Sequence, residues 1–232
     1  MTYKLTSISQ PADPYYGAVS LLLHGDGTNG STTIVDNSPS PKTVTAVGNA
    51  QISTTQSKFG GSSMYFDGTG DCLQSAPSET FRLGNGDFTI ECWAYFSALD
   101  ANTTVLRLDS GSGFNGVLFA HTSSLNCYAT SAGSSWDILT GQSLGSVTTG
   151  TWYHLCLTRS GSTFRGFLNG GVAFTATSSS SIYQLSPVVR IGAANSGGAI
   201  AMNGYIQDLR ITKGIARYTR NFTPPTTAFL TL

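Results

Sequence analysis

The chain has 232 residues, of which 40% are hydrophobic and only 10% are charged, with 12 basic residues balancing 12 acidic ones. Since typical soluble domains carry roughly 25% charged residues, Ser, Thr, Asn, Gln and Gly must form most of the surface. The charge balance argues against a basic surface for nucleic acid or acidic membranes. The hydrophobic content is enough for a core and argues against disorder, and the length fits one large all-β domain.

The first 17 residues, MTYKLTSISQPADPYYG, contain two prolines and an irregular pattern. We expect residues 1–17 to form an arm outside the folded body, which spans 18–232. The stretch has one Lys and no long apolar region, so it does not read as a signal peptide. The chain contains no run of 18 apolar residues, so no membrane span is predicted.

Beyond the arm, short runs of β-branched and aromatic residues alternate with Gly, Asn, Asp and Ser clusters, and helical periodicity is almost absent. The predicted strands are, in chain order, 19–24, 44–47, 63–67, 71–75, 87–96, 103–108, 116–121, 124–130, 151–159, 163–168, 171–175, 188–192 and 203–212. Turns at Ser160–Ser162 and Asn169-Gly170 predict hairpins that join 151–175 into a meander. So many short strands predict a sandwich of two antiparallel sheets.

The four cysteines, Cys72, Cys92, Cys127 and Cys156, form no C-x-x-C pair and match no zinc spacing. Two of them lie inside apolar strand-like runs. We expect buried free thiols that pack as small hydrophobes, with disulfides as the alternative.

Large side chains on two of the predicted strands are the candidate ligand contacts. Strand 87–96 has large side chains on both faces, and Trp93 and Tyr95 lie on the same face. Strand 151–159 contributes His154. Two interpretations stay open. These three residues line a concave sugar-binding face, or they fill the core or lie beneath loops.

No catalytic residues are predicted. Glycoside hydrolysis normally needs two facing carboxylates, and the only glutamates, Glu79 and Glu91, are not spaced as such a pair. The sequence GQSLG places Ser143 at the nucleophile position of G-x-S-x-G, but a loop and a strand follow it where the motif requires a helix.

The stretch 202–225 holds several basic residues, but they do not share one periodic face, so a nucleic-acid site is not favoured. Its first part is predicted to be a closing strand. Strict alternation would place Tyr205, Gln207, Leu209 and Ile211 on one face and Ile206, Asp208, Arg210 and Thr212 on the other. The residues that follow are expected to wrap the sandwich until Pro224-Pro225 prevents further pairing.

Oxygen ligands for calcium are also present. The Gly-rich loop after residue 24 offers Asp26 and Asp36, and Asp208 is an acid in mid-strand that needs a partner. The alternative is that Asp208 pairs with Arg210 or with a loop amide.

Five ordered blocks resemble one family: SLLLHGDGTNGSTTIVDNS, FGGSSMYFDGTGDCL, GDFTIECWAYF, TWYHLCLTRSG and MNGYIQDLRITKGIARYTRNFTPP. Together they resemble the laminin G-like, concanavalin A-like lectin/glucanase domains of tailed-phage and bacterial surface proteins, over roughly 17–229. The resemblance implies an all-β, antiparallel two-sheet jelly-roll sandwich. It does not specify a ligand, because this fold serves many functions.

In related glucanases an Asp of the final strand helps to hold a structural calcium ion, so the resemblance implies Asp208 and Asp26 as ligands of Ca²⁺. The glucanase catalytic pattern Glu-x-Asp-x-x-Glu has no counterpart in this chain. That departure implies a protein that is not an enzyme.

These inferences lead to a non-enzymatic phage virion protein of the capsid-decoration or head-fibre type, with glycan binding left open. The alternatives are a tail-associated adhesin for host glycans and a carbohydrate-binding module of a surface protein. The expected partners are other virion proteins, of capsid or tail, and host surface glycans, without nucleic acid or membrane, and a homo-oligomer stays open. The expected location is the virion, after synthesis in the host cytoplasm.

Overall fold

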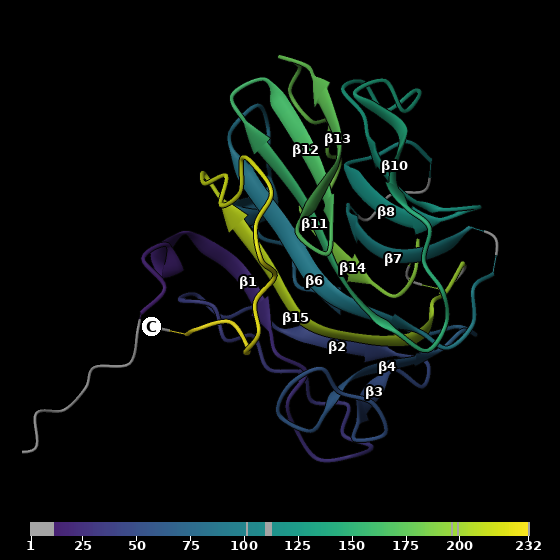
Figure 1. Cartoon of the computed structure of the whole chain (residues 1–232). Coiled ribbons are helices and arrows are strands. Elements are labelled where there is room, and N and C mark those ends of the chain that lie inside the picture. Colours follow the sequence, from purple (N-terminus) through teal and green to yellow (C-terminus); the bar gives the residue numbers. More distant parts are fainter. Residues whose placement is uncertain (1–11, 101, 110–112, 196, 199, 232) are drawn as a thin grey trace, which may run out of the picture.

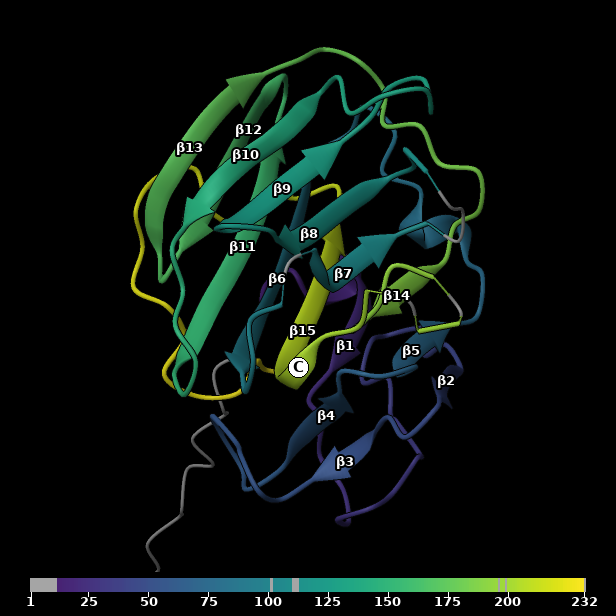
Figure 2. The same cartoon turned by 90° about the vertical axis from the view of Figure 1, so that its right-hand side faces the viewer.

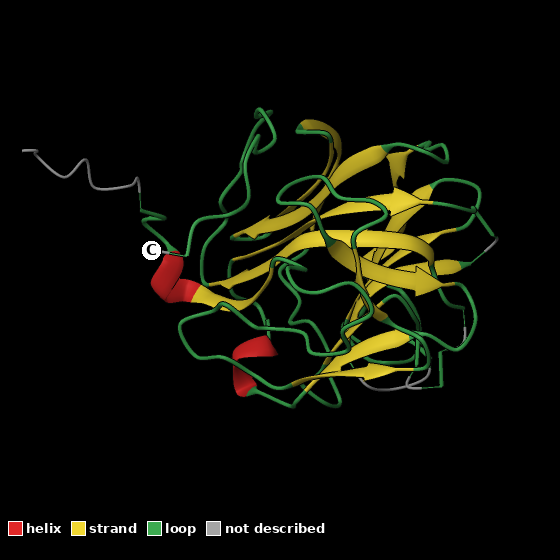
Figure 3. Ribbon diagram, turned by 90° about the horizontal axis from the view of Figure 1, so that it is seen from below, coloured by secondary structure: helices red, strands yellow, loops and turns green. Residues whose placement is uncertain are grey.

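The computed structural model describes residues 12–100, 102–109, 113–195, 197–198 and 200–231. Two antiparallel sheets face each other across one apolar core (Figures 1 and 2). Within the described residues, helix is limited to two short 3-10 turns, η1 (Tyr16–Ala18) and η2 (Glu79–Phe81), as Figure 3 shows. The predicted all-β sandwich is therefore confirmed.

Within the described residues, sheet A has eight strands. Its order is β13 (Gly171–Thr177), β12 (Thr163–Leu168), β11 (Trp152–Ser160), β6 (Phe88–Phe96), β15 (Asn203–Lys213), β4 (Ser63–Asp67) and β3 (Gln51–Ser53), and β1 (Val19–Leu23) also pairs with β15. Strand β15 is long enough to pair with β6 on one side and with β4 and then β1 on the other. It therefore lies at the centre of the sheet.

In the part of the chain that the structure describes, sheet B has seven strands. Its order is β10 (Leu139–Gly145), β9 (Leu125–Ala129), β8 (Val117–His121), β7 (Thr103–Leu108), β14 (Val189–Ile191), β5 (Cys72–Ser75) and β2 (Val44–Val47). Figure 2 shows this sheet in front of sheet A. Both two-residue hairpins of the meander are present, because Ser160 pairs with Thr163 and Leu168 with Gly171.

Alternate residues of each strand enter the core, as the period of a strand requires. In β6, Ile90, Cys92 and Ala94 face the core. The residues between them, Glu91 and Trp93, therefore point to the outer face of sheet A, and both are nonetheless buried. The cysteines are free and buried, as predicted. No described helix is long and apolar enough to cross a membrane.

Two strands, β3 and β10, were not predicted. Strand β3 has only three residues, and β10 reads LTGQSLG, with two register shifts against β9 and no run of β-branched residues. Their sequences lack the apolar alternation that signals a strand, so pairing with neighbours must specify them. Ser143 lies within β10 and is exposed, which is not the strand-to-helix turn of a nucleophile elbow.

The alternation predicted for β15 is wrong beyond its midpoint. A register shift separates Gln207 from Arg210, and Asp208 between them has φ +52°. This bulge inserts one extra residue, so Ile206, Leu209 and Ile211 all enter the core. Arg210 consequently lies on the outer face, beside Glu91.

A wrapping segment, residues 214–231, crosses the outer face of sheet A and is the yellow trace over β15, β6 and β11 in Figure 1. The Thr89 hydroxyl donates to the Ile215 carbonyl, and the Phe222 amide donates to the Gly170 carbonyl. The rings of Tyr218 and Phe222 stack 3.6 Å apart. This segment covers the polar side chains of the central strands.

The predicted arm divides into two parts. Residues 1–11 lie outside the described residues. Asp13, by contrast, has its side chain 5% exposed and forms ion pairs with Arg210 and Arg217 at 3.2 and 2.7 Å. Burial alone would raise the pKa of Asp13, but the hydrogen bond from Arg217 and the two positive charges outweigh it and lower this pKa. The end of the arm is therefore held against the wrapping segment.

Candidate functional site

A row of four aromatic side chains crosses the outer face of sheet A. In register, Tyr205 of β15 lies opposite Tyr65 of β4 and Tyr95 of β6, and Tyr95 lies opposite Trp152 of β11. Consecutive ring centroids are 5.0, 5.7 and 5.6 Å apart. Three of the rings are partly exposed, and Tyr205 is 7% exposed. Chain regions far apart in sequence thus form one continuous aromatic surface, the aromatic row.

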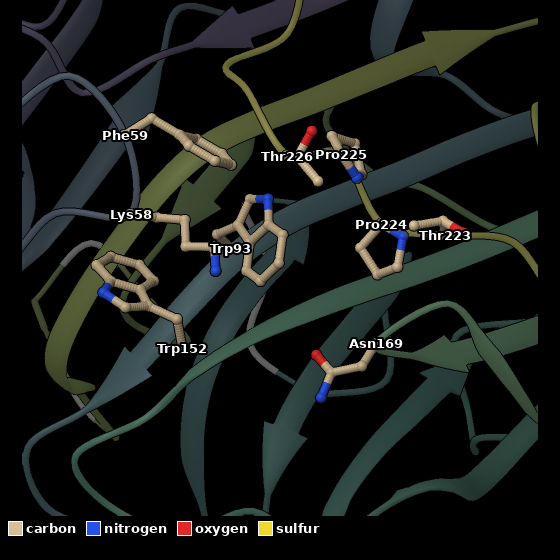
Figure 4. Close-up of a pocket in the computed structure, with 9 residues that line it drawn as sticks. All are labelled: Lys58, Phe59, Trp93, Trp152, Asn169, Thr223, Pro224, Pro225 and Thr226. Atoms are coloured by element: carbon tan, nitrogen blue, oxygen red, sulfur yellow. The ribbon is translucent and has the colours of Figure 1, made fainter.

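A pocket of about 540 Å³ adjoins the row at Trp152. Figure 4 shows its lining side chains, which are Lys58, Phe59, Trp93, Trp152, Asn169, Thr223, Pro224, Pro225 and Thr226. They come from the loop before β4, from β6 and β11, from the β12–β13 turn and from the wrapping segment. Its volume lies in the range of roughly 300–1,000 Å³ typical of small-ligand sites.

Trp93 lies at the centre of this lining, and Figure 4 shows it between Lys58 and the prolines of the wrapping segment. The Lys58 ammonium lies 4.2 Å from a Trp93 ring centroid, a cation–π contact, and Phe59 meets Trp93 edge-on at 5.8 Å. Gln207 fixes the loop, because its side chain accepts from the amides of Lys58 and Phe59 and donates to the Phe59 carbonyl.

Beneath the wrapping segment lies a buried charged group. Both side chains of the Glu91–Arg210 pair are at most 6% exposed, and the shortest N–O distance is 2.7 Å. The other Glu91 oxygen is 3.3 Å from His154 Nε2. Burial would raise the pKa of Glu91, but Arg210 and His154 outweigh it and lower this pKa to about 2. Glu91 is therefore a permanently ionised structural anion near neutral pH.

The three predicted ligand-binding residues lie on the same face but differ in access. Tyr95 belongs to the aromatic row and is partly exposed, and Trp93 borders the pocket while being 5% exposed. His154 is fully buried, because its ring lies between Trp93 and Phe222 at centroid distances of 5.2 and 5.6 Å. His154 thus supports the pocket from below.

The two predicted metal ligands differ as well. Asp26 is exposed in the loop after β1. Asp208 is fully buried at the β15 bulge, where one carboxylate oxygen lies 2.5 Å from His24 Nδ1 and the other accepts from the Phe229 amide at 2.7 Å. Asp36, the other loop candidate, accepts hydrogen bonds from the backbone amides of Leu22 in β1 and of Ser38 and Lys42 in its own loop.

The donors around Asp208 do not fit a calcium site, because protein N–H groups already bind both carboxylate oxygens. Among the described residues, no group of three or more His, Cys, Asp and Glu side chains is arranged to hold a metal. Calcium binding stays a prediction from the resemblance.

The calcium prediction is tested by adding Ca²⁺ to protein stripped with a chelator. From the geometry of Asp208, we expect the melting temperature to stay unchanged, since a ligand that binds only the folded state must raise it. A calcium-dependent rise that disappears in Asp208→Asn and Asp26→Asn would instead support the predicted pair of ligands.

Several residues of this surface were not predicted to be site residues from the sequence. Tyr65 and Tyr205 lie in strands that were predicted, but only the strand order places them beside Tyr95. Lys58 and Asn169 lie in turns, where polar residues are common for local reasons. The sequence feature that indicated a site on this face was the aromatic content of β6 and β11.

A comparison of the sequence with models of known protein families identifies the family of this chain. Residues 67–216 match the laminin G-like family described as the concanavalin A-like lectin/glucanases superfamily. This range is more than half of the chain, so the chain belongs to that family. A comparison with curated proteins gives no match.

Solved structures with the same fold share little sequence with the chain. Domain 4 of AbnA, a GH43 extracellular arabinanase from Geobacillus stearothermophilus solved in complex with arabinotriose, has a TM-score of 0.63 and 15% identity, covering 84% of this chain and 92% of that one. The binding domain of Paraclostridial Mosquitocidal Protein 1 has a TM-score of 0.65 and 15% identity, covering 90% of this chain. The botulinum neurotoxin serotype D binding domain has a TM-score of 0.65 and 14% identity, covering 88%. This chain spans half of each toxin binding domain.

Proposed function

We propose that the chain is a non-catalytic glycan-binding domain that contacts sugars through the aromatic row. The row itself carries the proposal. Tyr65, Tyr95 and Trp152 present partly exposed rings, and consecutive rings of the row, which also includes Tyr205, have centroids 5.0 to 5.7 Å apart. Sugar rings have apolar C–H faces that pack on aromatic faces, while tyrosine hydroxyls bind sugar hydroxyls.

The low charge of the chain is consistent with this proposal, because a surface rich in Ser, Thr, Asn and Gln offers hydroxyl and amide groups that can bind sugar hydroxyls. At the β4 end of the row, Asn203 pairs with Asp67 on the same face and adds groups that can bind sugar hydroxyls. The domain of the arabinanase that was solved with arabinotriose has the same fold, which supports a sugar as the ligand class.

Hydrolysis is not part of the proposal. Glu91 is fully buried, paired with Arg210 and held ionised, so it cannot donate a proton to a leaving group near neutral pH. Glu79 is exposed at η2 and pairs with Arg82. The two glutamates therefore do not form the facing carboxylate pair that glycosidases use.

Trp152 belongs to both the aromatic row and the adjoining pocket. Trp152→Ala should weaken binding to the best glycan of an array by about tenfold or more, because it removes the ring shared by the row and the pocket. Isothermal titration measures the affinity. Trp136→Ala is the matched control, since Trp136 packs with Tyr128 of β9 in sheet B. Equal losses in both variants, or no binding by the native chain to any glycan, would contradict the proposal.

We further propose, from the resemblance to phage domains, that the domain is a component of a virion. Capsid decoration is the leading role there, and a tail adhesin or a carbohydrate-binding module of a surface protein are the alternatives. Because Asp13 is bound to Arg210 and Arg217, residues 1–11 are the part of the arm to delete in a docking test. If the shortened chain occupies particles as fully as the native chain does, docking through the arm is contradicted. If the native chain itself is absent from particles, the virion role is contradicted.

A further inference from the structure

The pocket beside the aromatic row is rich in hydrogen-bond donors and poor in negative charge. None of the described residues that line it is Asp or Glu. Among the described residues, no carboxylate lies within ion-pair distance of the Lys58 ammonium, which is exposed at the pocket and held there over Trp93. A lysine ammonium that has no carboxylate partner nearby is available to pair with an anionic ligand.

A second donor is buried without a partner. Trp93 is 5% exposed, and its indole N–H has no acceptor among the described residues. Figure 4 shows the indole nitrogen on the side of the ring nearest Thr226 and Phe59, within the lining of the pocket. Buried polar groups in native proteins almost always have a partner, so one that lacks it calls for an explanation.

A third donor is oriented by the backbone. The Asn169 side-chain oxygen accepts from the His154 amide at 2.9 Å, so its NH₂ group is the part left to donate. Asn169 holds this position at φ +50° in the β12–β13 turn, followed by Gly170 at φ +78°. An asparagine tolerates this left-handed conformation better than most residues do.

From these donors we infer that the pocket binds an acidic sugar, whose carboxylate or sulfate accepts from Lys58 and from the Trp93 indole. This inference rests on the proposed glycan binding and adds the class of sugar. A sugar ring stacked on Trp152, which belongs to both the row and the pocket, places a charged substituent toward Lys58. The ligand then supplies the acceptor that the indole lacks and the anion that Lys58 lacks.

The subsite can be tested separately from the row. In ¹⁵N-labelled protein, the Trp93 indole N–H resonance, assigned with Trp93→Phe, is followed during titration with glucuronate, glucose 6-sulfate and glucose. We expect this resonance to shift with one or both of the anionic sugars, and glucose at equal concentration to leave it in place. The two anionic arms tell a carboxylate from a sulfate preference. No shift with either anion, or an equal shift with glucose, would overturn the inference.

The charge requirement is tested by Lys58→Gln, an exposed change that should leave the fold intact. It should abolish the shift and remove a preference of about tenfold for acidic over matched neutral oligosaccharides. Lys213→Gln, which removes an exposed charge at the far end of β15, should keep both. If neutral glycans still bind through Trp152 while Lys58→Gln changes nothing, the acidic subsite fails and the proposed glycan binding survives.

Discussion

Glu91→Ala is expected to lower the free energy of unfolding by about 3–5 kcal/mol, because it leaves the buried Arg210 without its main partner. Glu91 receives hydrogen bonds from Arg210 Nε at 3.0 Å and Nη2 at 2.7 Å. Arg210 also stacks on the Phe229 ring at 3.7 Å, so it cannot turn to solvent without disturbing the wrapping segment. Urea unfolding followed by circular dichroism gives the difference.

The chain contains its own control for this experiment. Glu79 is its only other glutamate, its side chain is 77% exposed, and it also pairs with an arginine. An exposed ion pair contributes about 0–1 kcal/mol, so Glu79→Ala should change stability little. Similar losses in the two variants would show that burial of the Glu91 pair is not the cause.

The same pair predicts how stability depends on pH. The pKa of Glu91 is about 2 in the folded chain, below its ordinary value of 4.5. Glu91 therefore contributes stability that is fully present above about pH 4.5 and is lost as the pH falls toward 2. Thermal melts of native protein and Glu91→Gln across this window should converge at the acid end.

Asp208→Ala is the second change with a large expected effect, about 3 kcal/mol of lost stability. It removes the acceptors of His24 and of the Phe229 amide, and it places alanine at φ +52°. Asp208→Gly keeps the loss of hydrogen bonds but relieves the backbone, and should recover about 1 kcal/mol. Asp208→Asn keeps an acceptor and should be the mildest of the three. Urea unfolding measures all three, and a glycine variant less stable than the alanine one would contradict the backbone part of this explanation.

The order and type of most elements could be predicted, because runs such as FTIECWAYF and WYHLCLTRS combine apolar content with a two-residue period. The alternation predicted for β15 failed because a bulge inserts one extra residue into the strand. The bulge at Asp208 is stabilised by His24 and Phe229, which are distant in sequence. The local alternation of apolar and polar residues therefore does not predict these contacts. The sequence therefore predicted that Leu209 shares a face with Tyr205 and Gln207, whereas in the structure Arg210 does.

The candidate site was only partly predictable for a similar reason. The spacing of Trp93 and Tyr95 in β6 predicted that they share one face of the strand, but not that this face is the outer one. The aromatic row needs the strand order β4-β15-β6-β11 as well, and that order is set by core packing across the whole chain. The burial of His154 depends on Phe222, whose position over β11 no local pattern specifies.

The central position of β15 also has a consequence for synthesis on the ribosome. Strands β1, β4 and β6 all pair with residues 203–213, so their partner is made after nearly all of sheet A. Until then β6 has an unpaired edge, and Glu91 and Arg210 cannot be covered, because Phe229 emerges later still. Sheet A is therefore completed only after its other strands have been made, and we expect a ribosome stalled before residue 203 to hold a chain with exposed strand edges that chaperones must protect.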